Sequence, residues 1–192
     1  MNKPAAGAFS SFFVISTLFI TTFFSPALLH SQETLLDVPF YPQQVYQCGP
    51  SAMASVMSYW DRPRSPETIA AEMFSEAARG SLTLDMYIYA IENGFEAKQG
   101  GADIAEIKRL LDTGEPVIVL VDNGFWIVRR GHYLVVVGYR DDGFFVHNGY
   151  RKNTFISFED FEKRWRRTGY WALIMHPESV FRGQSSGGGK IN

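Results

Sequence analysis

The sequence contains only one cysteine, Cys48, in 192 residues. A single cysteine cannot form an internal disulfide, so this thiol is a small buried hydrophobic group, pairs with another molecule or works as a free reactive group. One cysteine and scattered histidines also lack the close spacing of zinc ligands. No glycine-rich phosphate loop follows a predicted strand. We therefore expect no metal and no other cofactor.

An excess of charge of either sign is missing as well. The 18 lysine and arginine residues nearly balance the 20 aspartate and glutamate residues, which leaves a formal net charge of −2. This balance gives no support for a nucleic-acid partner. Hydrophobic residues make up 46% of the chain and aromatic residues 15%. This composition favours a folded globular protein over a disordered chain.

Charged residues are absent between Lys3 and Glu33. The apolar stretch at 12–24 inside this gap is shorter than the roughly 18 residues of a membrane-spanning helix, and small residues suitable for cleavage follow it. This pattern is typical of an export signal. We expect residues 1–31 to send the protein to the periplasm or the extracellular space. If the segment stays uncleaved, it would instead anchor the protein in the membrane.

The rest of the chain is long enough for one domain, which we place at residues 32–178. The segment 179–192 is rich in glycine and serine, which predicts a disordered tail. Helical patterns fill the first half of the domain. They predict helices from Cys48 to about 60, from 66 to near 80, over 82–93, where Leu84, Ile88 and Ile91 recur at helical spacing, and from Asp103 to Gly114.

Short β-branched and aromatic runs dominate the second half. They predict strands over 116–121, 131–139, 144–148, 154–156 and 170–175, with a helix over about 157–167 and a shorter strand near 95–98. A hairpin turn is expected at Asp141 and Asp142. Helices followed by an antiparallel sheet indicate an α+β fold. Cys48 belongs to the helical half, so a base from the sheet half would meet it in a cleft between the two.

Cys48 lies where a polar loop gives way to the apolar run 52–60. Pro50 suits the first turn of a helix, where its missing N–H has no partner in any case. The thiol should therefore lie at a helix N-terminus, where free N–H groups and the helix dipole favour the thiolate. Burial as an inert hydrophobic side chain is the alternative, and reactivity also requires a base.

Three histidines are candidates for that base. His132 opens the most apolar strand, where a polar ring is costly unless it faces a cleft or has a partner. His176 precedes a proline at the end of the last strand, so we expect it at the surface. His147 and Asn148 are neighbours on one strand and point to opposite faces. His132 is therefore the candidate base, and Asn148 could orient its ring.

At this point the sequence resembles the bacteriocin-processing cysteine peptidases, papain-like enzymes whose transporter-fused members cut leader peptides after a double glycine. It is closest to the stand-alone exported members, and the resemblance covers about 36–177. Three motifs carry it: Gln43-x4-Cys48-Gly49-Pro50, Gly131-His132-Tyr133-x-Val135-Val136-x-Gly138-Tyr139, and Phe161-x3-Trp165-x3-Gly169-Tyr170-Trp171.

The resemblance implies a papain-like fold and assigns roles to individual residues. Cys48 would be the nucleophile and His132 the general base and acid. An upstream glutamine would donate to the oxyanion; Gln43 matches this position best, and Gln44 is its near neighbour. The third catalytic position departs from the family, because the usual Asp-Pro is replaced by Asn148 and a glycine. Asparagine can still hold the tautomer of the histidine.

Two further features leave alternatives open. Asp141 and Asp142 could replace the missing carboxylate, although a turn position makes them hairpin residues. Arg129 and Arg130, next to His132, either attract an acidic substrate segment or are solvated charges at a strand end. The basic run 163–167 is interpreted as a solvated helix face.

The sequence thus predicts an exported papain-like cysteine peptidase that hydrolyses peptide bonds in a peptide or protein substrate, with cleavage after small or double-glycine sequences as a further expectation. The alternatives are an inactive relative that binds peptides or leaders in its cleft, and a thiol acyltransferase or amidase that uses the same dyad. A membrane partner is expected only if residues 1–31 remain attached.

Overall fold

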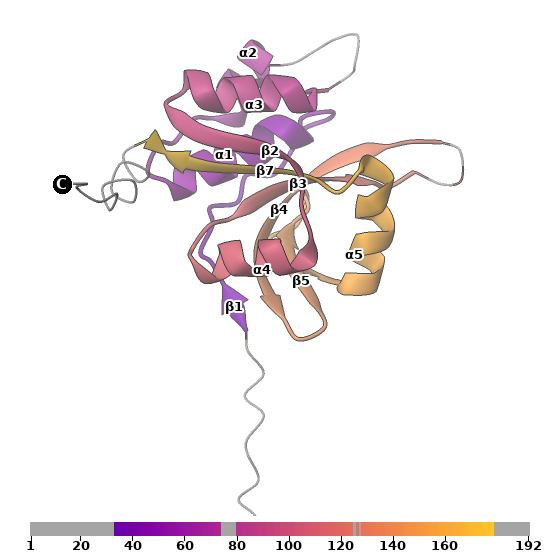
Figure 1. Ribbon diagram of the computed structural model, residues 1–192. Coiled ribbons are helices and arrows are strands. Elements are labelled where there is room, and N and C mark those ends of the chain that lie inside the picture. Colours follow the sequence, from indigo (N-terminus) through magenta and orange to yellow (C-terminus); the bar gives the residue numbers. More distant parts are fainter. Residues whose placement is uncertain (1–32, 74–79, 125, 127, 179–192) are drawn as a thin grey trace, which may run out of the picture. The chain divides into compact units, whose positions relative to one another are not determined.

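One antiparallel sheet with helices on both faces forms the core of the protein (Figure 1). The computed structural model describes residues 33–73, 80–124, 126 and 128–178. The helices are α1 (Cys48–Tyr59), α2 (Pro66–Met73), α3 (Thr83–Glu92), α4 (Ile104–Asp112), α5 (Phe158–Trp165) and the short 3-10 helix η1 (Arg166–Thr168). The strands are β1 (Thr34–Leu35), β2 (Phe95–Gly101), β3 (Val117–Asp122), β4 (Gly131–Arg140), β5 (Gly143–His147), β6 (Thr154–Ser157) and β7 (Trp171–Pro177).

The strands follow the order β2-β7-β3-β4-β5-β6, and β1 pairs with β4 outside this path. Strand β4 is therefore central, with β3 on one side and β5 on the other. Val121 lies opposite His132 and Asp122 lies opposite Gly131 in the β3–β4 register. The beginning of β4 and the end of β3 consequently lie at the same end of the sheet, and the candidate base lies there.

Side chains alternate between two hydrophobic clusters along β4. Tyr133 and Val135 point to the cluster that includes α1, α2 and α3. Leu134 and Val136 point to the opposite cluster, which includes α4 and α5. Both faces of this strand are covered, which explains why it reads as a continuous apolar run rather than an alternating one.

The α+β prediction is confirmed, and most predicted elements occur with ends shifted by a few residues. Helix α3 differs in its orientation. Leu84, Ile88 and Ile91 are 42–55% exposed, and the buried face contains Met86 and Ala90 instead. The helix carries apolar residues around much of its circumference, so its apolar spacing alone does not define the buried face.

The predicted export segment 1–31 and the predicted tail 179–192 lie outside the described residues. Among the residues that the structure describes, no helix is both long enough and apolar enough to cross a membrane.

Candidate active site

Cys48 is the first residue of α1, as the sequence predicts. Gln47 precedes it at the N-cap, and its main-chain carbonyl accepts from Ser51 N–H at 3.1 Å. Pro50 falls among the first four helical positions, whose N–H groups have no intrahelical acceptor, so its missing donor costs nothing there. The local sequence therefore places the thiol at the open end of a buried helix.

Gly49 allows the segment before α3 to close against this helix end. A Cβ atom at Gly49 would lie 2.9 Å from both Cβ and Oγ of Ser81. Tyr133 fastens the same segment, because its hydroxyl donates to the carbonyl of Ser81 at 3.1 Å. The glycine after the cysteine is thus explained by close packing beside the site.

The thiol of Cys48 meets β4 through the main chain. The main-chain N–H of Tyr133 acts on the sulfur and favours its charged form, so Cys48 lies near the strand position next to His132. Burial raises the pKa of the Cys48 thiol above its ordinary value, although N–H groups of Tyr133, Gly49 and Cys48 itself act in the opposite direction. The free thiolate that the helix N-terminus suggested is therefore not favoured: desolvation outweighs the helix end.

His132 is held by a main-chain carbonyl. Its Nε2 lies 2.8 Å from the carbonyl oxygen of Asn148. A carbonyl can only accept, so Nε2 carries the proton, and Nδ1 of the neutral ring keeps a free lone pair. Burial lowers the pKa of His132, and the charge of Arg130 lowers it further, whereas the Asn148 carbonyl opposes both. Nδ1 is consequently available as a base near neutral pH.

The side chain of Asn148 has another task than the one expected. Its Oδ1 accepts from the main-chain N–H of Tyr150 at 3.0 Å and of Arg151 at 2.8 Å, and its Nδ2 donates to Thr154 Oγ1 at 3.2 Å. The expected side-chain contact with His132 is therefore replaced by a main-chain contact. Asparagine serves here because its short acceptor closes the turn after β5.

Gly149 explains the rest of the departure from Asp-Pro. Its φ of +81° is closed to proline, whose ring fixes φ near −65°. The carbonyl of Gly149 accepts from Gln43 N–H at 2.7 Å. A Cβ atom at Gly149 would lie 2.6 Å from Cδ of Gln43. The turn that fixes His132 therefore packs directly on the side chain of the candidate oxyanion donor.

The two candidate glutamines lie in different surroundings. Oε1 of Gln43 is buried and has no hydrogen-bond partner among the described residues. Gln44 is exposed, and its Nε2 donates to Glu67 at 3.4 Å, away from this turn. Gln43 is thus the glutamine whose side chain packs on the turn that holds His132. Gln47 has no role in the motif, but its Oε1 is also buried without a partner among those residues. Its position next to Cys48 is the sequence feature that could have identified it.

The remaining candidates lie elsewhere. Asp141 and Asp142 form the turn between β4 and β5, at the opposite end of β4 from His132. His147 is 3% exposed and donates from Nε2 to the carbonyl of Val38 at 3.0 Å.

The surface position expected for His176 is wrong. Its side chain is 8% exposed and its Nε2 lies 2.8 Å from a carboxylate oxygen of Glu115. Glu115 follows α4 in the chain, and an ionisable partner of this kind allows the last strand to bury a histidine.

An open cavity of about 350 Å³ lies at the start of β4. Gly131, directly before His132, forms part of its wall. Trp171 forms another part, and its ring centroid is 5.7 Å from that of Tyr133. The lining residues are Thr83, Leu120, Asp122, Arg129, Gly131, Thr168 and Trp171. In the described part of the chain, no group of three or more histidine, cysteine or acidic residues could hold a metal ion.

A thiol, an imidazole with a free nitrogen and a buried amide at one end of a helix-on-sheet fold invite comparison with known peptidases. The model of the Peptidase C39-like family matches residues 35–173. The chain belongs to this family. No curated protein matches the chain.

Solved structures of C39 peptidases share the fold. The peptidase domain of Streptococcus ComA, a bifunctional ABC transporter involved in quorum sensing, is 26% identical, with a TM-score of 0.61 over 75% of this chain and 98% of that one. A C39-like protein from Bacillus anthracis is 16% identical, with a TM-score of 0.64 over 76% and 98%. A double-glycine-motif protease from an AMS/PCAT transporter, solved with its leader peptide, is 20% identical, with a TM-score of 0.61 over 75% and 94%.

These comparisons confirm the resemblance to the double-glycine peptidases and the papain-like α+β fold. The match extends over the helix that carries Cys48 and over β4 with His132.

Proposed function

We propose that this protein is a cysteine peptidase that hydrolyses peptide bonds with Cys48 as nucleophile and His132 as general base. One observation carries the proposal. The Tyr133 N–H acts on the Cys48 thiol and lowers its pKa, which places the sulfur near β4, while the adjacent His132 bonds through Nε2 to a carbonyl and keeps Nδ1 free. A nucleophile and a base are thus brought to neighbouring positions, and the base is oriented by a third group.

The pKa directions support a neutral resting dyad. Burial raises the pKa of Cys48 and lowers that of His132, so thiol and imidazole are both uncharged near neutral pH. As the sulfur attacks the peptide carbonyl carbon, Nδ1 takes the thiol proton. The imidazolium then gives this proton to the leaving amine, and a thioester remains on Cys48. Water attacks the thioester with His132 again as base, the acid product leaves, and the proton returns to the sulfur.

Two donors are suited to the negative oxygen of each tetrahedral intermediate. One is the main-chain N–H of Cys48 at the start of α1, and the other is the amide of Gln43, which is held beside the turn at Gly149. Such a donor typically contributes about 3 kcal/mol to transition-state stabilisation. The carbonyl of Asn148 accepts from Nε2 throughout and so favours the transient imidazolium.

The substrate we propose is a peptide. The double-glycine-motif protease of similar fold binds a leader peptide, and cleavage after small or double-glycine sequences is the corresponding hypothesis for this chain. We further propose export to the periplasm or the extracellular space through residues 1–31. The apolar and uncharged composition of that segment supports this proposal.

The test is cleavage-site profiling on a peptide library by mass spectrometry. Cys48→Ala and His132→Ala are matched controls. We expect the wild-type protein alone to generate new peptide ends. Wild-type binding of library peptides without cleavage would favour a peptide-binding domain, and products joined to an added amine would favour an acyltransferase.

A further inference from the structure

The cavity at the start of β4 has an apolar wall and two charged residues. Leu120 and Trp171 supply apolar surface, and Asp122 and Arg129 supply the charges. Asp122 is the last residue of β3, and Arg129 lies two positions before β4. A side chain that enters this cavity lies next to Gly131, the residue directly before His132. The charge that the cavity favours in such a side chain depends on whether Asp122 or Arg129 is available to pair with it.

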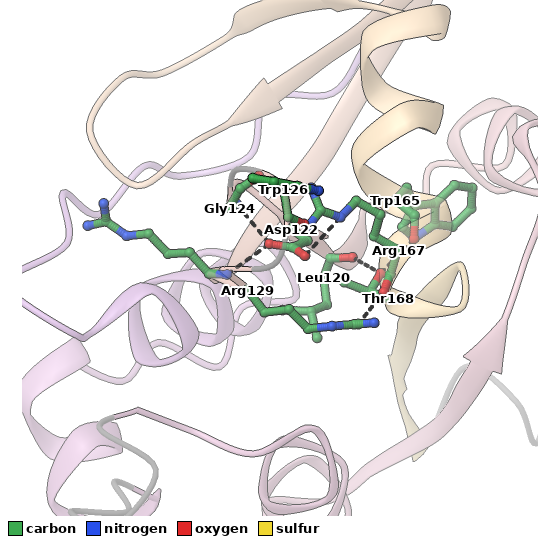
Figure 2. Close-up of polar contacts among 9 residues, drawn as sticks. Leu120, Asp122, Gly124, Trp126, Arg129, Trp165, Arg167 and Thr168 are labelled. Carbon is green, nitrogen blue, oxygen red and sulfur yellow. Dashed lines mark hydrogen bonds and ion pairs between the residues drawn. The ribbon is translucent and has the colours of Figure 1, made fainter.

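Asp122 is buried and bonded within the protein. Its Oδ1 accepts from the N–H groups of Gly124 and Arg130, both at 2.8 Å, and its Oδ2 lies 3.1 Å from Nε of Arg167 (Figure 2). The carboxylate is 3% exposed. Burial alone would raise the pKa of Asp122, but these N–H groups and the charges of Arg167 and Arg129 together lower it. The charge of Asp122 is therefore buried and balanced inside the protein by Arg167.

The guanidinium of Arg167 bonds to the loop that follows Asp122. Beyond Asp122, its Nη1 donates to the carbonyl of Gly124 at 2.9 Å and its Nη2 to that of Trp126 at 3.0 Å (Figure 2). The hydroxyl of Thr168 donates to Leu120 O at 2.6 Å, which ties η1 to β3 at the cavity wall. This network fixes the wall and uses the Arg167 charge to balance Asp122.

Arg129 has no carboxylate at ion-pair distance among the described residues, although its charge also lowers the pKa of Asp122. Its Nη1 donates to the carbonyl of Arg167 at 2.8 Å (Figure 2), and among the described residues it forms no ion pair with a carboxylate. A guanidinium has five N–H donors, so four stay available after this bond. The carbonyl anchors the side chain without neutralising it. Arg129 therefore presents an oriented positive charge at the cavity wall.

The charges on the neighbouring elements leave a positive balance. Asp122 and Arg167 cancel, and Asp85 on α3 bonds to the N–H of Leu82 at 3.4 Å. Arg129 and Arg130 are both exposed, but only Arg129 lines the cavity. With Asp85 counted against the two exposed arginines, one positive charge remains.

We propose that this cavity is a substrate subsite that selects an acidic residue near the scissile bond. The proposal rests on the peptidase function proposed above and adds a substrate class. The carboxylate of the substrate would pair with Arg129, and its methylene groups would pack on Leu120 and Trp171. Hydrogen bonds to charged groups typically contribute about 1.5–3 kcal/mol. We therefore expect a preference of about 10- to 100-fold in kcat/KM for glutamate over its neutral isostere glutamine.

The experiment uses the full chain and peptides that differ by Glu, Gln or Lys at each position flanking the cleaved bond. Wild-type protein should prefer Glu over Gln at one position by about tenfold or more. Arg129→Gln should remove this preference while still cleaving the Gln peptide. Arg129→Glu should favour Lys at the same position. Arg130→Gln, the matched control, removes an exposed charge that does not line the cavity and should keep the preference.

Cleavage without a preference for Glu in wild-type protein, or a preference that survives in Arg129→Gln, would overturn the subsite. Absence of all cleavage would instead contradict the proposed peptidase function. In that case, fluorescence anisotropy with labelled Glu and Gln peptides on Cys48→Ala still decides the subsite. Tighter binding of the Glu peptide, lost in Cys48→Ala/Arg129→Gln, supports it, and equal binding of the two peptides rejects it.

Discussion

His132 and His147 differ in the hydrogen bonding of one ring nitrogen, Nδ1. Both rings lie on neighbouring strands of the sheet, and in both Nε2 faces a main-chain carbonyl, that of Asn148 for His132 and that of Val38 for His147. Burial lowers the pKa of both. Nδ1 of His147 accepts from Asn153 N–H at 3.3 Å, whereas Nδ1 of His132 has no partner in the described structure.

This difference separates a structural histidine from a candidate base. His147 uses both nitrogens to tie the N-terminal segment to the turn after β5. That turn carries the Asn148 carbonyl, which in turn holds His132. The buried ring therefore supports the loop, and the loop orients the half-buried ring that keeps one nitrogen free. A histidine in an apolar strand becomes a functional candidate only when one of its nitrogens is left over.

The largest expected effect comes from removing each ring in turn. His132→Ala should lower kcat/KM by about 100- to 10,000-fold, because it removes the general base and acid. His147→Ala should cost at least tenfold less activity per folded molecule, in the range expected for loosening a support. It should instead lower the free energy of unfolding by about 1–3 kcal/mol for each group left unpaired, Val38 O and Asn153 N–H.

Steady-state kinetics and urea unfolding of both variants check this contrast. Equal losses of activity in two well-folded variants would mean that His132 has no special role.

The next effect concerns the amide that packs on the His132 turn. Gln43→Ala should lower kcat by about 10- to 1,000-fold, because it removes a proposed oxyanion donor. Gln44→Ala is the matched control and should leave kcat nearly unchanged, since its side chain is directed to Glu67. Gly149→Ala should resemble Gln43→Ala, because a Cβ atom there displaces that side chain. A loss in Gln44→Ala alone would reverse the choice of donor.

The helices and strands that carry this site were predictable where short local sequence patterns determine them. Pro50 and the apolar run after it mark the start of α1, and β-branched runs mark β3 and β4. The face of α3 was not predictable, because apolar residues such as Leu84 and Met86 lie on both sides of the helix, and packing on the rest of the domain selects between them.

The partner of His132 was predicted at the right position but with the wrong atom. The sequence points to Asn148 through its distance from the histidine, but a main-chain carbonyl is present in every residue and leaves no compositional signal. Gly149, which follows that carbonyl, has a positive φ and packs against the side chain of Gln43, and neither feature can be derived from local composition. The engagement of Asp122 with Arg167 was likewise hidden, because the two residues are far apart in sequence.

The pH dependence of activity should report the neutral dyad. Because the pKa of His132 lies below the ordinary 6.5, wild-type protein should keep more than about half of its maximal kcat/KM at pH 6.5. Because the pKa of Cys48 lies above the ordinary 9.0, the alkaline limb should begin above that pH. Thiolate absorbance near neutral pH should be missing. A strong thiolate signal at pH 7 would show a charged resting pair instead.

The pH dependence of stability should report His147. A histidine in the unfolded chain protonates near pH 6.5, whereas the folded His147 does so only at lower pH. Between these values the unfolded state binds more protons, so stability decreases as the pH falls below about 6.5. His132 and His176 act with the same sign. Urea unfolding at pH 7.5 and 5.0 should show a smaller decrease for His147→Gln than for wild type, and equal decreases would exclude His147 as a contributor.

The smallest effect is expected at Asn148, where the side chain acts only through the turn. Asn148→Asp keeps an acceptor for Tyr150 and Arg151 N–H and leaves the main-chain carbonyl on His132 in place. Its kcat/KM should stay within about threefold of wild type. The added carboxylate near the ring should raise the pKa of His132 and move the acid limb of the profile to higher pH, while the alkaline limb, which reports Cys48, stays in place.

Asn148→Leu leaves both N–H groups without their acceptor at about 1 kcal/mol each, and should lower activity by about tenfold through a loosened turn. Measured pH profiles of the two variants separate the possibilities. A loss in Asn148→Asp as large as in Asn148→Leu would show that the amide itself, rather than the carbonyl behind it, holds His132 during the reaction.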